Sequence, residues 1–132
     1  MDQKILVVDD ELVSRKKMKK ILTKYGVCTD VDTGQKAVLV FARALQSGEP
    51  FDMISLDIGL PDANGTEVVL QIRKLEEEHA PGDYKAVKIL MVTGRSDRDS
   101  VLTSIQAGCD QYVIKPIDPA LIAEKLTKMN FI

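Results

Sequence analysis

The stretch SLDIGLPDANG, residues Ser55–Gly65, joins a hydrophobic run to a loop through one aspartate. The largely apolar run Phe51–Leu56 predicts a buried strand, and Asp57 stands where that strand should end. Gly59 and Pro61 follow, and both residue types are typical of turns. Asp57 is therefore either a turn residue or a reactive carboxylate at the edge of a sheet.

Outward from this stretch, strand-like and helix-like patterns alternate along the chain. Short Val, Ile and Leu runs predict strands covered on both faces, and apolar residues three or four apart predict helices. The predicted strands are Lys4–Val8, Val27–Val31, Phe51–Leu56, Val87–Val92 and Gln111–Ile114. The predicted helices are Glu11–Tyr25, Gln35–Gln46, Gly65–Glu78, Asp97–Ala107 and Pro119–Met129. Gly26 and Gly108 should end the first and fourth helices, and Asp118 should cap the last.

This alternation predicts an α/β fold with a five-stranded parallel sheet between layers of helices. Parallel neighbours need a helical crossover, and right-handed crossovers cover both faces of the sheet. Ligands of such open sheets bind at the carboxyl ends of the strands. A length of 132 residues fits one domain, so we expect residues 1–132 to form it.

Composition excludes several classes of function. The formal net charge of −2 gives no indication of direct nucleic-acid binding, and no segment is apolar enough for a signal peptide or a membrane span. Cys28 and Cys109 lack a CxxC spacing and nearby histidines, so a metal site built on thiolates is not indicated. We expect both cysteines to be reduced and half-buried in a cytoplasmic protein.

Polar residues collect where the predicted strands end. They are Asp9, Asp10, Asp57, Thr93 and Lys115. Each has an ordinary alternative role: the acids could cap a helix or form a turn, the threonine could be a helix cap, and the lysine could be solvated. Because the carboxyl ends of parallel strands share one edge, their joint occurrence favours a common site.

Clustered carboxylates repel one another unless a cation binds between them. Oxygen ligands without histidine or thiolate suit Mg²⁺, and a lysine and a hydroxyl beside it could bind phosphate oxygens. That combination indicates phosphoryl transfer to an aspartate. Neither GxxxxGK[ST] nor GxGxxG occurs, so the sequence predicts neither a nucleoside-triphosphate-binding P-loop nor a dinucleotide-binding site.

These residues resemble the receiver domain of bacterial two-component response regulators, of the single-domain chemotaxis-regulator kind. The matching motifs are ILVVDDE (Ile5–Glu11), SLDIGLPDANG (Ser55–Gly65), MVTG (Met91–Gly94) and YVIKP (Tyr112–Pro116). The resemblance extends over Lys4–Met129 and implies a flavodoxin-like fold with strand order 2-1-3-4-5. It also implies a cis peptide before Pro116, which would aim the preceding lysine into the site.

The resemblance implies a role for each site residue. Asp57 would accept a phosphoryl group from a sensor histidine kinase or a phosphotransfer protein. Asp10 and Asp57 would bind Mg²⁺ directly, Asp9 would do so through water, and the carbonyl of Gly59 would add a ligand. Lys115 would bind a phosphoryl oxygen. The protein would act on no other substrate, so it is not expected to be an enzyme beyond modifying its own aspartate.

A conformational switch is implied as well. Thr93 would move to the phosphoryl group and let Tyr112 turn inward, which would reshape the surface of the fourth helix, fifth strand and fifth helix. Tyr112 could instead merely fill the edge of the core. An unidentified downstream protein would read that surface, with the domain a monomer or a weak phosphorylation-dependent dimer.

The basic residues of the first helix have two interpretations. They are Arg15, Lys16, Lys17, Lys19 and Lys20, which form either a solvated face or a docking surface for the histidine-bearing partner. His79, the sole histidine, is expected at the surface near a helix end.

Some positions depart from the usual pattern of the family. Gly59 and Arg95 should set the lifetime of the phosphoryl group. Ile117 stands where an aromatic residue is frequent, and the segment Glu76–Lys85 is longer than usual and lies away from the site.

The alternative function is a Mg²⁺-dependent phosphatase or phosphotransferase that acts on a small molecule through an aspartyl phosphate. Enzymes of that kind place an acid two residues after the nucleophile, where this chain has Gly59.

Overall fold

The computed structural model describes residues 2–94 and 98–132. The strands are β1 (Lys4–Val8), β2 (Val27–Val31), β3 (Met53–Asp57), β4 (Lys88–Thr93) and β5 (Gln111–Ile114). The helices are α1 (Leu12–Leu22), α2 (Gly34–Gln46), α3 (Gly65–His79), α4 (Arg98–Ala107) and α5 (Pro119–Lys128). In these described segments the strands form one parallel sheet in the order β2-β1-β3-β4-β5, which confirms the predicted fold and strand order.

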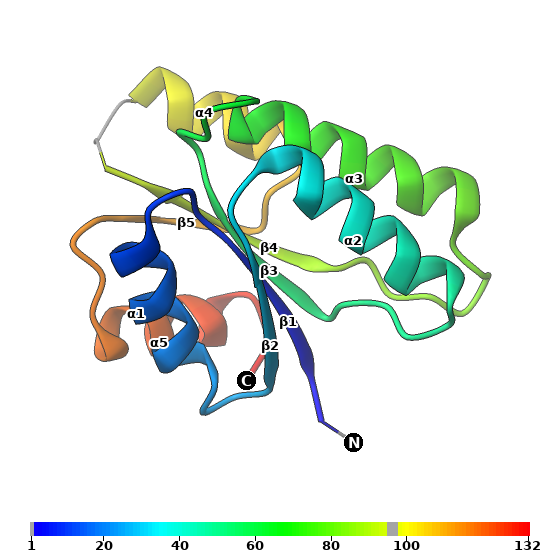
Figure 1. Cartoon of the computed structure of the whole chain (residues 1–132), viewed down its shortest axis with the longest axis horizontal. Helices are drawn as coiled ribbons and strands as arrows, with labels where there is room; N and C mark the ends of the chain where they lie inside the picture. Colours follow the sequence, from blue (N-terminus) through cyan, green and yellow to red (C-terminus); the bar gives the residue numbers. More distant parts are fainter. Residues whose placement is uncertain (1, 95–97) are drawn as a thin grey trace.

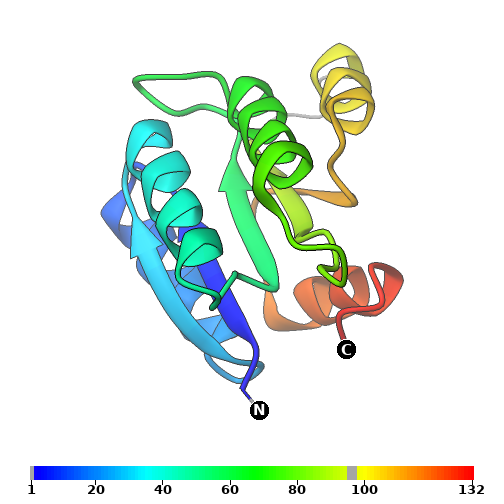
Figure 2. The same ribbon diagram turned by 90° about the vertical axis from the view of Figure 1, so that its right-hand side faces the viewer.

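The sheet lies between two layers of helices. Helices α1 and α5 cover one face, and α2, α3 and α4 cover the other (Figures 1 and 2). Successive residues of a strand point to opposite faces, so Leu6 and Val8 of β1 pack towards α2 and α3 while Ile5 and Val7 pack towards α1 and α5. Burial of each such side chain stabilises the fold by roughly 1.5–3 kcal/mol, which makes the two apolar clusters the main source of stability.

The first helix is shorter than predicted, since α1 ends at Leu22 and not at Tyr25. The hydroxyl of Thr23 donates to the Lys19 carbonyl over 2.7 Å, and the chain then turns. Gly26 is needed there for space, because a Cβ atom at this position would lie 2.4 Å from the Gln3 carbonyl oxygen. Close approach to the start of β1, and not a left-handed helix cap, therefore accounts for this glycine.

Strand β2 is more exposed than the prediction of doubly covered strands implied. It lies at the edge of the sheet, pairs only with β1 among the described strands, and leaves Val27 57% exposed. An edge strand has one neighbour, so fewer of its side chains are enclosed. The inner strands β1, β3 and β4 are buried almost throughout, as predicted.

Several smaller predictions have clear outcomes. Asp118 caps α5, His79 is exposed at the end of α3, and both cysteines are free and half-buried. The Lys115–Pro116 peptide is cis. None of the helices in the described part of the chain has the length and apolar character that a membrane span requires. The roles predicted for Arg95 and for Asp97 as the start of the fourth helix lie outside the described residues.

Candidate functional site

Three aspartates come together at the carboxyl edge of the sheet. Asp9 and Asp10 follow β1, and Asp57 is the last residue of β3, the neighbouring strand in register. Each of the three offers a carboxylate oxygen, and these oxygens lie within 4.8 Å of one another. Asp9 and Asp57 are only 5% and 8% exposed, whereas Asp10 faces solvent. The cluster is thus enclosed by the sheet on one side and open to water on the other.

Lys115 reaches this cluster from the end of β5. Its Nζ atom lies 3.1 Å from Oδ2 of Asp57 and 3.5 Å from Oδ2 of Asp9. The alternative that Lys115 is a solvated lysine is therefore wrong. Three carboxylates and one ammonium leave a formal charge of −3 + 1 = −2 at this edge, which a divalent cation would balance.

Burial and charge pairing shift the pKa values of this pair. Burial raises the pKa of Asp57, and the charge of Asp9 adds to that effect, although the Gly59 amide and the Lys115 ammonium oppose it. Burial works against the charged form of Lys115, but its hydrogen bond to Asp57 and the charges of Asp57 and Asp9 outweigh burial and raise its pKa. Lys115 is therefore held as an ammonium beside the carboxylates.

Asp9 is held by its own turn and by α1. Its carboxylate accepts a hydrogen bond from the Glu11 amide over 2.9 Å, and its backbone carbonyl accepts one from Nη1 of Arg15 over 3.1 Å. No acidic residue occupies the first turn of α1, and the cap residue Glu11 makes no side-chain capping bond. The alternative that these acids serve to cap the first helix is not supported.

The loop after Asp57 is tightly closed. The Gly59 amide donates to Oδ1 of Asp57 over 2.9 Å, and the Gly65 amide donates to the Ile58 carbonyl over 2.9 Å. A Cβ atom on Gly65 would lie 2.7 Å from the Ile58 Cα atom, so a larger residue would force this loop open. Asp57 is thus both a turn residue and a member of the acidic cluster.

Thr93 and Tyr112 lie on the strands beside the cluster. Thr93 is the buried last residue of β4, and its carbonyl accepts the Lys115 amide over 2.7 Å, so the two residues are neighbours at this edge. Tyr112 is partly buried on β5 opposite Met91, and Nζ of Lys125 lies 5.2 Å from its ring centre. The ring packs against the core and also meets the α5 surface.

Asp62 is a residue of the site loop that sequence reasoning missed. Its two carboxylate oxygens accept from the Gly34 and Gln35 amides, each over 2.9 Å, which fastens the loop to the start of α2. These backbone hydrogen bonds lower the pKa of Asp62. The partners lie 28 and 27 residues away, so no local pattern could have revealed the contact.

The residues present fit a hard divalent cation. Carboxylate oxygens at a partly wet edge are the ligands that Mg²⁺ prefers, and it commonly keeps several waters. The converging oxygens of Asp9, Asp10 and Asp57 and the formal charge of the cluster agree with this preference.

Comparison with known proteins identifies the family. A family model described as the response regulator receiver domain matches residues 5–127. The chain belongs to this family. The receiver domain is 36% identical over 118 residues to TorR, the TorCAD operon transcriptional regulatory protein of Escherichia coli O157:H7. That match covers 89% of the chain but only 46% of TorR, so the chain spans about half the length of this relative.

Two further relatives match this receiver domain over most of their length. A chemotaxis protein CheY homolog of Campylobacter jejuni is 32% identical over 123 residues, which is 93% of this chain and 88% of the relative. The receiver domain of the histidine kinase CKI1 from Arabidopsis thaliana, solved with Mg²⁺ and BeF3⁻, is 27% identical with a TM-score of 0.81. That match covers 98% of this chain and 91% of the solved one. This receiver domain is thus similar in fold to one solved with a divalent cation.

Proposed function

We propose that residues 1–132 act as one receiver domain that accepts a phosphoryl group on Asp57 from a phosphohistidine. The carboxylate of Asp57 would attack the phosphorus atom, the phosphorus–nitrogen bond would break, and the electron pair would leave with the imidazole nitrogen. The observation that carries this proposal is the convergence of the oxygens of Asp9, Asp10 and Asp57 with the Lys115 ammonium. A cytoplasmic location agrees with two free thiols.

Each site residue has a defined part in this proposal. Mg²⁺, when bound, would neutralise the negative charge of the Asp57 carboxylate and of the phosphoryl oxygens as they approach. Asp10 and Asp57 would hold it directly, Asp9 through water, and Gly59 through its carbonyl oxygen. Lys115 would transfer its hydrogen bond from Asp57 to a phosphoryl oxygen, which its position 3.1 Å from the acceptor carboxylate favours.

Switching would begin at Thr93, whose hydroxyl would donate to another phosphoryl oxygen. Tyr112 would then turn inward and change the surface formed by α4, β5 and α5, which an unidentified protein would bind. The domain would work as a monomer or as a weak phosphorylation-dependent dimer. It would modify no molecule other than itself.

The phosphohistidine donor would dock on the start of α1. Leu12 and Val13 are 59% and 80% exposed there, close to the acidic cluster, and the exposed Lys16 and Lys20 follow on the same helix. Apolar contact with a basic rim suits a partner with an acidic border. Arg15 and Lys19 are excluded from this role, because both donate to Asp30 over 2.9 Å, whereas Nζ of Lys16 lies 3.9 Å from Asp30 and its side chain stays 60% exposed.

Docking predicts a selective effect of charge reversal. Replacing Lys16 and Lys20 together by glutamate should slow transfer from a phosphorylated histidine phosphotransfer protein by about tenfold or more, because steering is lost. Labelling by acetyl phosphate should stay unchanged. Equal loss with both donors, measured by intact mass against time, would contradict the docking role.

Intact mass tests the function itself. With acetyl phosphate and Mg²⁺, the protein should gain one phosphoryl group and Asp57→Asn should gain none.

A turnover assay with a generic phosphomonoester distinguishes a receiver domain from a small-molecule phosphatase. Sustained release of phosphate far above one equivalent of protein would favour the phosphatase. The absence of any side chain at Gly59, where such an enzyme needs its general acid, argues against that result.

A further inference from the structure

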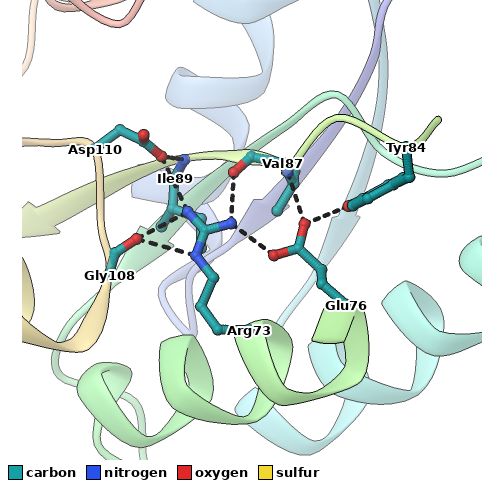
Figure 3. Close-up of polar contacts among 7 residues, drawn as sticks. All are labelled: Arg73, Glu76, Tyr84, Val87, Ile89, Gly108 and Asp110. Atoms are coloured by element: carbon teal, nitrogen blue, oxygen red, sulfur yellow. Dashed lines mark hydrogen bonds and ion pairs between the residues drawn. The ribbon is translucent and has the colours of Figure 1, made fainter. Parts of the chain in front are cut away.

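The side chain of Arg73 joins three elements on the α3 side of the sheet (Figure 3). From α3, its Nε and Nη2 atoms donate to the Gly108 carbonyl over 3.1 and 2.8 Å. Its Nη1 atom donates to the Val87 carbonyl over 2.9 Å, just before β4. Gly108 directly follows the last residue of α4, so Arg73 holds the carboxyl end of that helix.

Gly108 and Arg73 fit each other closely. Gly108 has a φ of +114°, a backbone conformation that favours glycine. A Cβ atom there would lie 3.3 Å from both Cγ and Nε of Arg73, so a side chain at this position would crowd the guanidinium. Glycine therefore serves both the turn after α4 and the approach of the arginine.

Two carboxylates hold the guanidinium in place. Glu76 accepts from Nη1 over 2.7 Å and Asp110 accepts from Nη2 over 3.1 Å. Asp110 also accepts from the Ile89 amide over 2.7 Å, which ties it to β4. Movement of Arg73 would leave these acids without their cation, and Glu76 is buried, so the arrangement resists displacement.

Glu76 is itself fixed from the other side. Its Oε2 atom accepts from the Tyr84 hydroxyl and, over 2.7 Å, from the Val87 amide. Burial and the charge of Glu76 raise the pKa of Tyr84, so the phenol keeps its proton and remains a donor. The connection between α3 and β4 thus supports Arg73 through Tyr84 and Glu76.

Helix α4 leaves large apolar side chains in solvent. Its packing contacts are chiefly with α3, and Leu102 and Ile105 remain 50% and 48% exposed. None of the α4 side chains whose burial the structure describes is fully buried. The amino end of α4 follows Thr93 in the chain, whereas its carboxyl end meets the network around Arg73. The carboxyl end of the helix is therefore tied to α3 and to the start of β4 through Arg73.

We propose that Arg73 is a positioning residue that anchors the carboxyl end of α4, so that phosphorylation of Asp57 displaces the amino end of the helix about Gly108. The inference rests on the proposed function, since the movement would start at Thr93. The carboxyl end of α4 would be the fixed point, or pivot, of this movement, and Arg73, which lies outside the acidic site, would hold it.

Hydrogen exchange of the whole chain, followed by mass spectrometry, tests this pivot. Addition of acetyl phosphate and Mg²⁺ should raise exchange in residues 98–102 by about threefold or more and leave residues 105–110 within about 1.5-fold. Arg73→Lys keeps a cation for Glu76 but loses the forked pair of bonds to Gly108. In that variant, residues 105–110 should also rise by about threefold or more on phosphorylation.

Two comparisons make the result decisive. Lys74→Met, at an adjacent side chain that is 77% exposed, should behave as the unmodified protein does. The rate of Asp57 phosphorylation should stay within about twofold in Arg73→Lys, because the contacts of Arg73 lie away from the acidic site. If Arg73 had a purely structural role, hydrogen exchange of residues 105–110 in Arg73→Lys would be raised equally with and without phosphorylation. That result would overturn the inference.

The remaining outcomes are also distinguishable. Equal increases at both ends of α4 in the unmodified protein, with the expected mass gain on Asp57, would overturn the pivot alone. Absence of any mass gain would contradict the proposed function and the pivot with it. Unchanged exchange in residues 105–110 of Arg73→Lys after a full mass gain would show that Arg73 is not the anchor.

Discussion

Lys115 supplies the positive charge of the candidate site, and its removal should change how the acids bind a cation. With its Nζ atom 3.1 Å from Asp57 and 3.5 Å from Asp9, the ammonium repels any cation that enters the cluster. Lys115→Met should therefore tighten Mg²⁺ binding by about fivefold, as removal of one nearby like charge implies. Calorimetric titration with MgCl₂ measures this.

The control is Lys128→Met, an exposed lysine on α5, which should leave the Mg²⁺ affinity unchanged. Lys115→Met should also slow phosphorylation by acetyl phosphate, since no ammonium remains to bind the phosphoryl oxygen. Weaker Mg²⁺ binding in Lys115→Met would contradict the assignment of Lys115 to the site.

The sequence alone could place four residues of the candidate site. Asp9, Asp10, Asp57 and Lys115 could be placed, because each directly follows or ends a predicted strand and parallel strands end at one edge. Their roles stay predictions until phosphorylation is measured.

At the scale of elements, α1 is fastened to β2 by a small ionic cluster. Asp30 accepts from Nε of Arg15 and Nζ of Lys19, each over 2.9 Å, and its side chain is 15% exposed. The hydrogen bond from Lys19 and the one from Arg15 outweigh burial and lower the pKa of Asp30. A lowered carboxyl pKa stabilises the fold above the unfolded value near 4, and this contribution is lost as the pH falls through the folded value.

Asp30→Asn should accordingly destabilise the protein in a pH-dependent way. We expect the free energy of unfolding to fall by about 1.5–3 kcal/mol at pH 7, as for hydrogen bonds to charged groups. The difference from the unmodified protein should be smaller at pH 3, which lies below the unfolded value near 4, because this contribution is lost as the pH falls through the lowered pKa of Asp30. Urea denaturation at the two pH values checks this, and a difference independent of pH would contradict it.

The elements themselves were largely predictable, whereas the contacts between them were not. Periodicity predicted the helices α2, α3 and α5 to within about two residues, because each has one clear apolar face. The end of α1 was missed, since the apolar Tyr25 continues the pattern beyond the point where Gly26 must approach Gln3. Long-range pairs such as Arg15 with Asp30 and Arg73 with Gly108 leave no periodic signal.

At the scale of the whole molecule, stability depends on the two apolar clusters on either side of the sheet. Phe41 of α2 is fully buried in the cluster that faces α2 and α3. Phe41→Ala should lower the free energy of unfolding by about 3–5 kcal/mol, because transfer and cavity terms add. That is a large share of the roughly 5–15 kcal/mol typical of a domain.

Leu39→Ala is the matched control, since Leu39 lies on the same helix but is 49% exposed. Its effect should stay within about 0.5–1 kcal/mol. Urea unfolding followed by circular dichroism distinguishes the two variants. Similar losses for both would mean that α2 does not present Phe41 to the core.

Chemical trapping tests whether Asp57 is the residue that accepts the phosphoryl group. After incubation with acetyl phosphate, borohydride reduces an aspartyl phosphate to homoserine, which peptide mass mapping locates at a single residue. We expect homoserine at position 57 alone and only when Mg²⁺ is present. Its yield should fall strongly when Asp10 is replaced by asparagine. Homoserine at any other aspartate, or formed equally well with EDTA in place of Mg²⁺, would contradict this role of Asp57.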